Sequence, residues 1–150
     1  MEEMNKEQIQ NLFIELDKIG DEKLKKDIFN HLGRDCYSCR DIDKWIGKFN
    51  NDIEAMIRWI STDASPYWEK LEYDESGQTL RLTGREVDAC ACEYCVSTAP
   101  LESLCLHCCK SFQEKLWSDL LQRKVSVEIT EAVNLGGKRC STRIYLHPDD

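Results

Sequence analysis

Long hydrophobic runs are missing from this sequence, and no apolar stretch approaches the roughly 20 residues of a membrane-spanning helix. The opening MEEMNKEQIQ also lacks the basic start and apolar core of a secretory signal peptide. We therefore expect a cytoplasmic protein with no membrane partner, in a compartment that keeps thiols reduced.

A basic surface is missing too. Asp and Glu outnumber Lys and Arg by 28 to 20, and the formal net charge is −8. A nucleic-acid partner requires basic side chains that displace counterions from phosphates. The sequence therefore predicts no nucleic-acid partner, and it leaves the oligomeric state open.

The first half of the chain predicts helices, because its apolar residues recur at helical spacing. Gly20 and Gly33 are expected to end the first two helices, and Asp21 and Asn51 or Asp52 are candidate N-caps. The predicted helices cover residues 5–19, 21–33, 42–49 and 52–60.

In the second half of the chain, the spacing of apolar residues changes from helical to alternating. Apolar residues alternate along 68–73 and 78–83, and again along 125–129 and 140–146, which is typical of two β-hairpins. Between the hairpins, Pro100 opens a long predicted helix, residues 100–122. The second hairpin turns at Gly136-Gly137-Lys138-Arg139, which lacks the following helix of a phosphate-binding loop.

This order of elements predicts an α+β fold: a helical layer, then a β-hairpin, a long helix and a second β-hairpin, with the antiparallel sheet packed on the long helix. A chain of 150 residues fits one domain. We divide it into a helical subregion, residues 1–62, and a cysteine-rich ββαββ subregion, residues 63–150.

Cysteine is abundant, with nine in the chain and six of them between positions 90 and 109. The number of cysteines is odd, and nine in 150 residues is a smaller fraction than the roughly 8–10% typical of small secreted disulfide scaffolds. Both observations favour metal ligands or reactive thiols over disulfides. The predicted metal ligands are Cys90, Cys92, Cys95, Cys105, Cys108, Cys109 and Cys140.

The cysteines of the long helix are predicted to share a face. At about 100° per residue, Cys105, Cys108 and Cys109 fall within one arc of roughly 100°. The same arc holds the apolar residues Leu101, Phe112, Leu116 and Leu120. These thiols should therefore point at the sheet, as ligands or as small core residues, whereas His107, about 160° from Cys105, should be exposed and point away.

Two metal centres fit the cysteine spacing. Zinc takes four thiolate or imidazole ligands, usually as short-spaced pairs from two segments, and Cys92 with Cys95 and Cys105 with Cys108 have that spacing. An iron–sulfur cluster also takes four cysteines, one of them distant in sequence, for which Cys140 is available. The sequence leaves the choice between these cofactors open.

A reactive thiol is a further possibility. The positive end of the long helix favours a thiolate at Cys95 or Cys105. A nucleophilic cysteine also needs a base, and none of the histidines, His31, His107 and His147, has a context that identifies it as one.

The first half adds a C-x-x-C pair. A thioredoxin-like redox pair follows a strand, and no strand is predicted before Cys36 and Cys39. We expect a loose pair, or a contribution to the same metal or ligand site from the helical layer.

The second half resembles a known family. Cys90-Ala91-Cys92, Leu104-Cys105-Leu106-His107-Cys108-Cys109, the strand 125–129 and the run 136–144 are similar to the 4-vinyl reductase type of small-molecule-binding domain and to bacterial L-2-amino-thiazoline-4-carboxylic acid hydrolase-like proteins. The resemblance covers roughly residues 67–146. It implies an α+β domain with a bound small molecule or metal, and cysteines as ligands, with Cys105, Cys108 and Cys140 at matching positions. The chain differs at Thr142, where an aromatic residue is more usual, and in Cys95 and Cys109.

These observations predict a cysteine-rich binding or sensor domain that holds a metal or small molecule between the long helix and the sheet. A thiol-dependent hydrolase of a small heterocyclic or amide substrate is one alternative. A structural or partner-binding module with no metal is the other.

Overall fold

The computed structural model describes residues 5–38, 47–62, 65, 67–76, 78–88 and 101–146. Within these ranges, no helix is both long and apolar enough to span a bilayer.

Two helices open the fold. Helix α1 (Lys6–Asp17) begins with a capping box, in which the Asn5 side chain accepts from the Gln8 amide and the Gln8 side chain accepts from the Asn5 amide. Helix α2 (Glu22–Ser38) follows, with the Asp21 carboxylate accepting from the Leu24 amide at 3.0 Å. The predicted starts of both helices are confirmed.

The predicted end of α2 at Gly33 is wrong, because the helix continues to Ser38. Gly33 lies inside the helix at a close crossing, where a Cβ atom would come within 2.2 Å of the Cys108 carbonyl oxygen. The glycine therefore permits close packing and does not end the helix.

Of the predicted third helix, residues 47–49 are helical, and the other positions lie outside the described residues. Helix α4 (Ile53–Ser61) follows. The Asp52 carboxylate caps it by accepting from the Ala55 amide at 3.1 Å, as one of the two predicted caps.

The two hairpins form one antiparallel sheet. Its strands are β1 (Trp68–Asp74), β2 (Thr79–Gly84), β3 (Ser126–Glu131) and β4 (Ser141–Tyr145). The spatial order is β1-β2-β4-β3, so the hairpins meet where β2 pairs with β4. With the helices that precede the strands, the sheet confirms the predicted α+β class.

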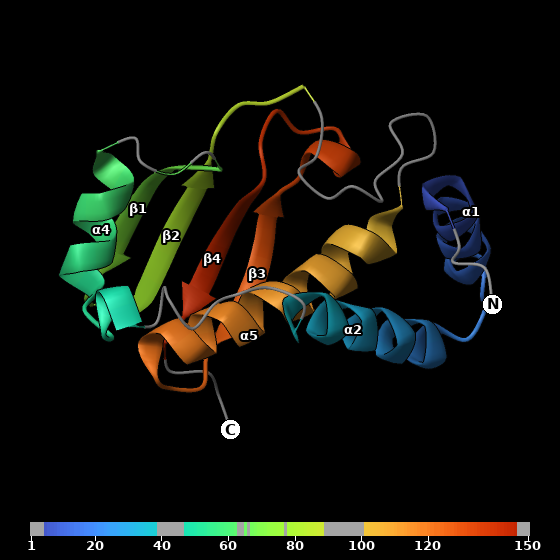
Figure 1. Ribbon diagram of the computed structural model, residues 1–150, viewed down its shortest axis with the longest axis horizontal. Coiled ribbons are helices and arrows are strands. Elements are labelled where there is room, and N and C mark those ends of the chain that lie inside the picture. Colours follow the sequence, from blue (N-terminus) through green and yellow to red (C-terminus); the bar gives the residue numbers. More distant parts are fainter. Residues whose placement is uncertain are drawn as a thin grey trace.

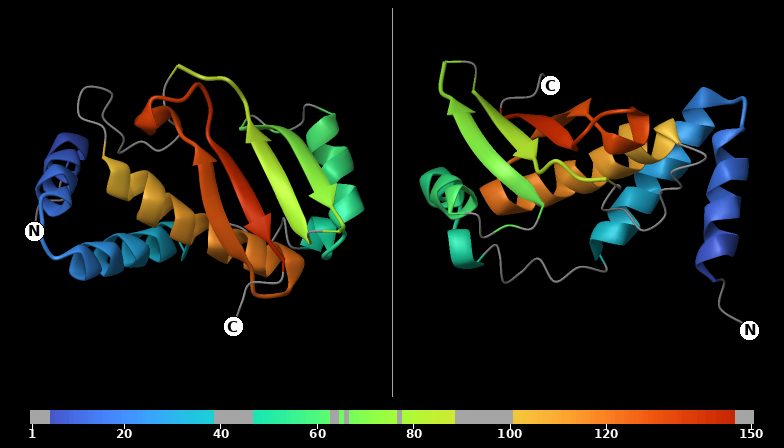
Figure 2. Two further views of the ribbon diagram at one scale, coloured as in Figure 1. Left: turned by 180° about the vertical axis from the view of Figure 1, so that it is seen from behind. Right: turned by 90° about the horizontal axis from the view of Figure 1, so that it is seen from above.

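Helices cover one face of the sheet. The described part of the long helix ends in α5 (Lys110–Leu121), which runs along this face, and α4 packs beside β1 (Figures 1 and 2). Apolar residues from both layers form the main core, among them Leu80, Leu82, Leu116, Trp117, Leu120, Val127 and Ile144. The opposite sheet face carries polar residues such as Arg81, Arg143 and Glu128.

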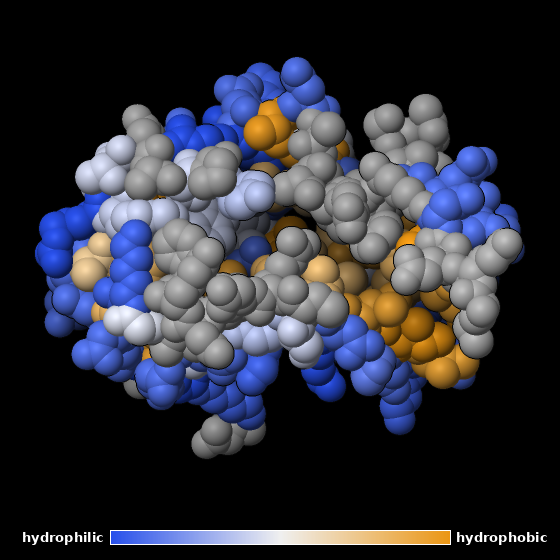
Figure 3. Space-filling model, viewed as in Figure 1, coloured by the Kyte–Doolittle hydropathy of each residue, from blue (hydrophilic) through white to orange (hydrophobic). Residues whose placement is uncertain are grey.

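A second, smaller core joins the helical layer to the start of the long helix. Phe13 of α1 and Phe29 of α2 pack with Leu101 and Leu104 there. Leu12 and Leu24 stay exposed at this end, where Figure 3 shows apolar side chains at the surface beside α1 and α2.

Candidate functional site

The cysteine-bearing part of the long helix is a π-helix, Leu104–Cys109, which continues into the α-helix α5 at Lys110. The sequence predicted an uninterrupted α-helix over 100–122. Hydrogen bonds in a π-helix run from i to i+5, so angles calculated at 100° per residue do not hold in this segment. Such segments occur frequently at functional sites.

Cys108 packs against the helical layer, contrary to the prediction that it points at the sheet. It contacts the small core of Phe13 and Phe29, and its carbonyl oxygen lies against Gly33. Three residues later, the Ser111 hydroxyl donates to the Asn30 carbonyl at 2.9 Å. Leu101, predicted to face the sheet, also belongs to the small core.

Cys109 is the last residue of the π-helix and lies three residues before Phe112, which packs against the sheet–helix core. Cys105, one turn earlier, is 4% exposed, and Cys109 is half-buried. Of the three helix cysteines that were predicted to share a face, Cys108 is the one that the structure places against the helical layer.

Cys140 is half-buried and directly precedes β4. A Cβ atom at Gly84 would lie 2.1 Å from the Cys140 carbonyl oxygen, so the end of β2 packs directly on the Cys140 backbone. The predicted alternation beyond Cys140 is confirmed, since Thr142, Ile144 and Leu146 are all buried.

The loop between β3 and β4 contacts the chain on both sides of positions 89–100. On one side, the Val87 amide donates to the Lys138 carbonyl at 3.0 Å. On the other, the buried Asn134 side chain donates to the Leu101 carbonyl at 2.8 Å. The segment that ends at residue 88 and the segment that begins at residue 101 are thus both hydrogen-bonded to the β3–β4 loop, which leads into Cys140.

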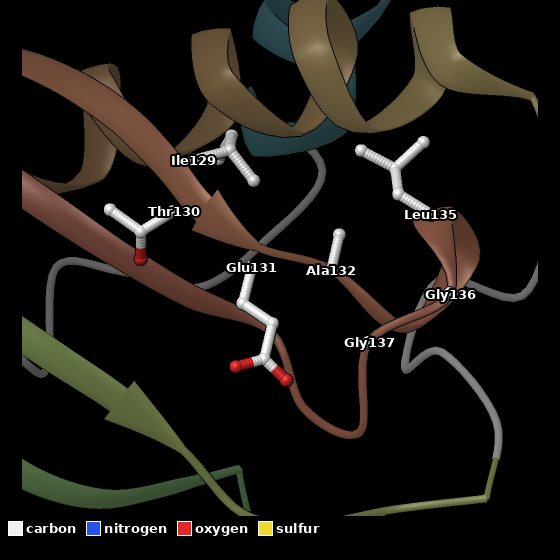
Figure 4. Close-up of a pocket in the computed structure, with 7 residues that line it drawn as sticks. All are labelled: Ile129, Thr130, Glu131, Ala132, Leu135, Gly136 and Gly137. Carbon is white, nitrogen blue, oxygen red and sulfur yellow. The ribbon is translucent and has the colours of Figure 1, made fainter.

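A shallow pocket of about 320 Å³ lies in the same region, at the end of β3. In Figure 4 the side chains of Ile129, Ala132 and Leu135 point toward the long helix, and that of Glu131 points away. The Glu131 carboxylate accepts from the Lys138 amide at 2.9 Å and so holds the loop closed. The Gly136–Gly137 turn thus belongs to a hairpin, as predicted, and Gly136 has a φ of 95°.

Thr142 is not among the site residues predicted from the sequence. It is 5% exposed, and its hydroxyl has no hydrogen-bond partner in the described part of the chain. The sign available in the sequence was that Thr142 is the one hydroxyl-bearing residue among the alternating residues Cys140, Thr142, Ile144 and Leu146.

His107 is not the exposed residue that the sequence predicted. It is half-buried and lines a polar pocket of about 360 Å³ with Glu22, Lys25 and Ser103, on the α2 side of the long helix. Burial lowers the pKa of His107 below 6.5, and the positive charges of Lys26, Lys110 and Lys25 lower it further, against an opposing effect of Glu22.

We expect an NMR titration to give a His107 midpoint below 6.5. Lys26→Gln should raise that midpoint only in part, because burial is the largest cause. Since the unfolded chain binds the proton more tightly, His107 makes unfolding easier as pH falls below 6.5. A midpoint above 6.5 in the wild type would contradict this account.

Cys39, Cys90, Cys92 and Cys95 lie outside the described residues, as does His147. Among the residues that are described, no three His, Cys, Asp or Glu side chains form a group that could hold a metal ion. Cys105, Cys109 and Cys140 therefore do not complete a centre by themselves, and the metal site stays a prediction.

No family model matches this chain, and no curated protein is significantly similar to it.

Proposed function

We propose that this chain is a cysteine-rich binding or sensor domain of a reducing cytoplasm, which holds a zinc ion or an iron–sulfur cluster between the long helix and the sheet. The observation that carries the proposal is the position of the β3–β4 loop. It contacts the chain on both sides of positions 89–100 and leads into Cys140.

The chain distances support a shared site. Cys90 is the third residue after Val87, and an extended chain covers at most about 3.3–3.6 Å per residue. Val87 is hydrogen-bonded to Lys138, two residues before Cys140. Cys90 is therefore within reach of Cys140.

The start of the long helix supplies the other side. Leu101 is tied to the same loop through Asn134, and Cys105 is buried one turn farther along the helix. A ligand set drawn from Cys90, Cys92, Cys95, Cys105, Cys109 and Cys140 would use thiolates from three segments. Cys108, which packs against the helical layer, is a weaker candidate than the sequence predicted.

The donor set suits a thiophilic metal, because thiolates are the ligands of structural zinc sites and of iron–sulfur clusters. Zinc would add stability, and a cluster would add a redox-active group. The residues of this chain would position the thiolates and exclude water. The same space between helix and sheet is also where a bound small molecule would lie.

The hydrolase alternative has less support. Among the described histidines, His31 contacts Asp35 at 3.3 Å and His107 lines the pocket beside α2. Neither is hydrogen-bonded to a cysteine, whereas a nucleophilic cysteine requires a base within hydrogen-bond reach.

Elemental analysis of protein purified without oxygen tests the proposal. We expect about one zinc per chain, or the iron and sulfide of a cluster. Cys109→Ser should lower the metal content. Cys36→Ser is the matched control and should leave the metal content unchanged. Cys36 is adjacent to Tyr37, whose hydroxyl donates to the Asp119 carboxylate near the end of α5, away from the cysteines at the start of the long helix. A wild type with below about 0.2 metal per chain and nine titratable thiols would overturn the proposal.

A further inference from the structure

The polar pocket beside α2 lies where α1 passes into α2, next to the start of the long helix. Figure 1 shows the α1–α2 junction and the start of the long helix at the same end of the molecule. The volume of about 360 Å³ is within the usual range for small-molecule sites. The lining residues come from each of these helices: Asp17, Glu22, Lys25, Glu102, Ser103, Leu106 and His107.

Ser103 is a buried polar side chain of this pocket. It is only 4% exposed, and it makes no side-chain cap hydrogen bond at the start of the π-helix. Its hydroxyl takes part in no hydrogen bond within the described part of the chain. The great majority of buried polar side-chain atoms in folded proteins have a partner. Because Ser103 lines the pocket, a bound molecule can supply that partner.

The charged groups of the lining favour a positively charged occupant. The ammonium group of Lys25 is already paired, at 3.1 Å from the Glu22 carboxylate and 3.4 Å from the Asp17 carbonyl oxygen. The carboxylates of Asp17 and Glu102 make no ion pair or side-chain hydrogen bond with any described residue. The lining therefore has an excess of negative charge and of hydrogen-bond acceptors.

His107 adds a hydrogen-bonding group to the lining without adding charge. Burial lowers its pKa, and Lys26 and Lys110 lower it further from outside the lining. The imidazole is therefore neutral at neutral pH, and a neutral imidazole has one nitrogen that accepts a hydrogen bond.

An organic cation suits these groups better than a metal ion does. No three His, Cys, Asp or Glu side chains of the described residues form a group that could hold a metal. A protonated primary amine has three N–H donors that rotate freely, so it can reach acceptors on different helices. Leu106, which is 38% exposed, offers an apolar contact for the carbon chain of such a molecule.

We propose that this pocket binds a small molecule with a protonated primary amine, which donates to the Ser103 hydroxyl and to the carboxylates of Asp17 and Glu102. The inference goes beyond the proposed function and involves none of the cysteines. Either can therefore fail without the other.

NMR titration with butylamine at neutral pH tests this, with the imidazole signals of His107 as the reporter. A probe this small should bind with a Kd on the order of 1 mM and shift the His107 signals until they saturate. The signals of His31, which contacts Asp35 on the exposed side of α2, should not move. Butan-1-ol lacks the charge and tetramethylammonium lacks the N–H donors, so both should bind at least about 10-fold more weakly.

Two variants test the named contacts. Ser103→Ala should weaken butylamine binding about 10-fold, because it removes a hydrogen bond to a charged group. Glu102→Gln, at an exposed position where the fold is not at risk, should weaken it about 3-fold. Glu54→Gln is the matched control, since it removes the same charge from the first turn of α4 and should leave the affinity unchanged.

The inference would be overturned by His107 signals that butylamine does not shift, or shifts no more than tetramethylammonium does. The second result would require only the net charge of −8. Unchanged affinity in both Ser103→Ala and Glu102→Gln would also overturn it. The metal content of the purified protein does not depend on these results and tests the proposed function separately.

Discussion

Trp117→Ala should lower the free energy of unfolding by about 3–5 kcal/mol, the usual cost of truncating a fully buried tryptophan. Trp117 is 1% exposed and lies in the core between α5 and the sheet. Its ring packs against Trp68 of β1 at 5.8 Å between centroids, and its Nε1–H donates to the Gln113 side chain at 3.0 Å. The truncation removes both contacts and leaves a cavity under the sheet.

Urea unfolding followed by circular dichroism measures this loss. Trp59→Ala provides a matched control, because Trp59, on α4, is only half-buried and packs against Phe49, which precedes that helix. The control should lose about 1–2 kcal/mol. Equal losses of unfolding free energy in the two variants would contradict the position of Trp117 in the buried core between α5 and the sheet.

Gly33→Ala should destabilise the protein by about 2–3 kcal/mol, although alanine is ordinarily the better residue inside a helix by roughly 0.5–1 kcal/mol. The new methyl group would approach the Cys108 carbonyl oxygen to 2.2 Å and the Ser111 Cβ to 3.0 Å. A backbone oxygen cannot rotate out of the way, so α2 must move away from the long helix. That movement would also strain the hydrogen bond from Ser111 to Asn30.

Gly20→Ala is the control for this substitution, because nothing lies within 4 Å of a Cβ atom there. It should change the stability by less than about 0.5 kcal/mol. A neutral or stabilising Gly33→Ala would mean that α2 and the long helix do not cross as closely as described.

The fold was predictable from the sequence where one periodic pattern decides the structure. The alternation of Val127 with Ile129, and of Thr142 with Ile144, predicted both strands of the second hairpin, because each strand has one covered face. Asp21 and Asp52 predicted helix starts, because a cap acts through local hydrogen bonds.

Predictions failed where a contact distant in sequence decides the structure. Gly33 resembled a helix end, and only the approach of Cys108 explains why it lies inside α2. The π-helix of 104–109 widens the helix exactly where α-helical angles were used to place Cys108 and His107. Their positions beside the helical layer follow from packing against α1 and α2, which periodicity does not encode.

The candidate site was predictable in its residue types more than in its geometry. Cysteine spacing identified the segments, but the contacts that draw them together, Val87 with Lys138 and Asn134 with Leu101, involve backbone carbonyls and leave no sequence pattern. Thr142 was missed for a related reason, since an unpaired hydroxyl is recognised only when its surroundings are known.

X-ray absorption at the metal edge of protein purified without oxygen tests the central proposal most directly, because it measures which atoms surround the metal. We predict a shell dominated by sulfur at about 2.3 Å, as thiolate ligands require. A metal surrounded only by nitrogen and oxygen would contradict a cysteine-held centre, as would protein that carries no metal.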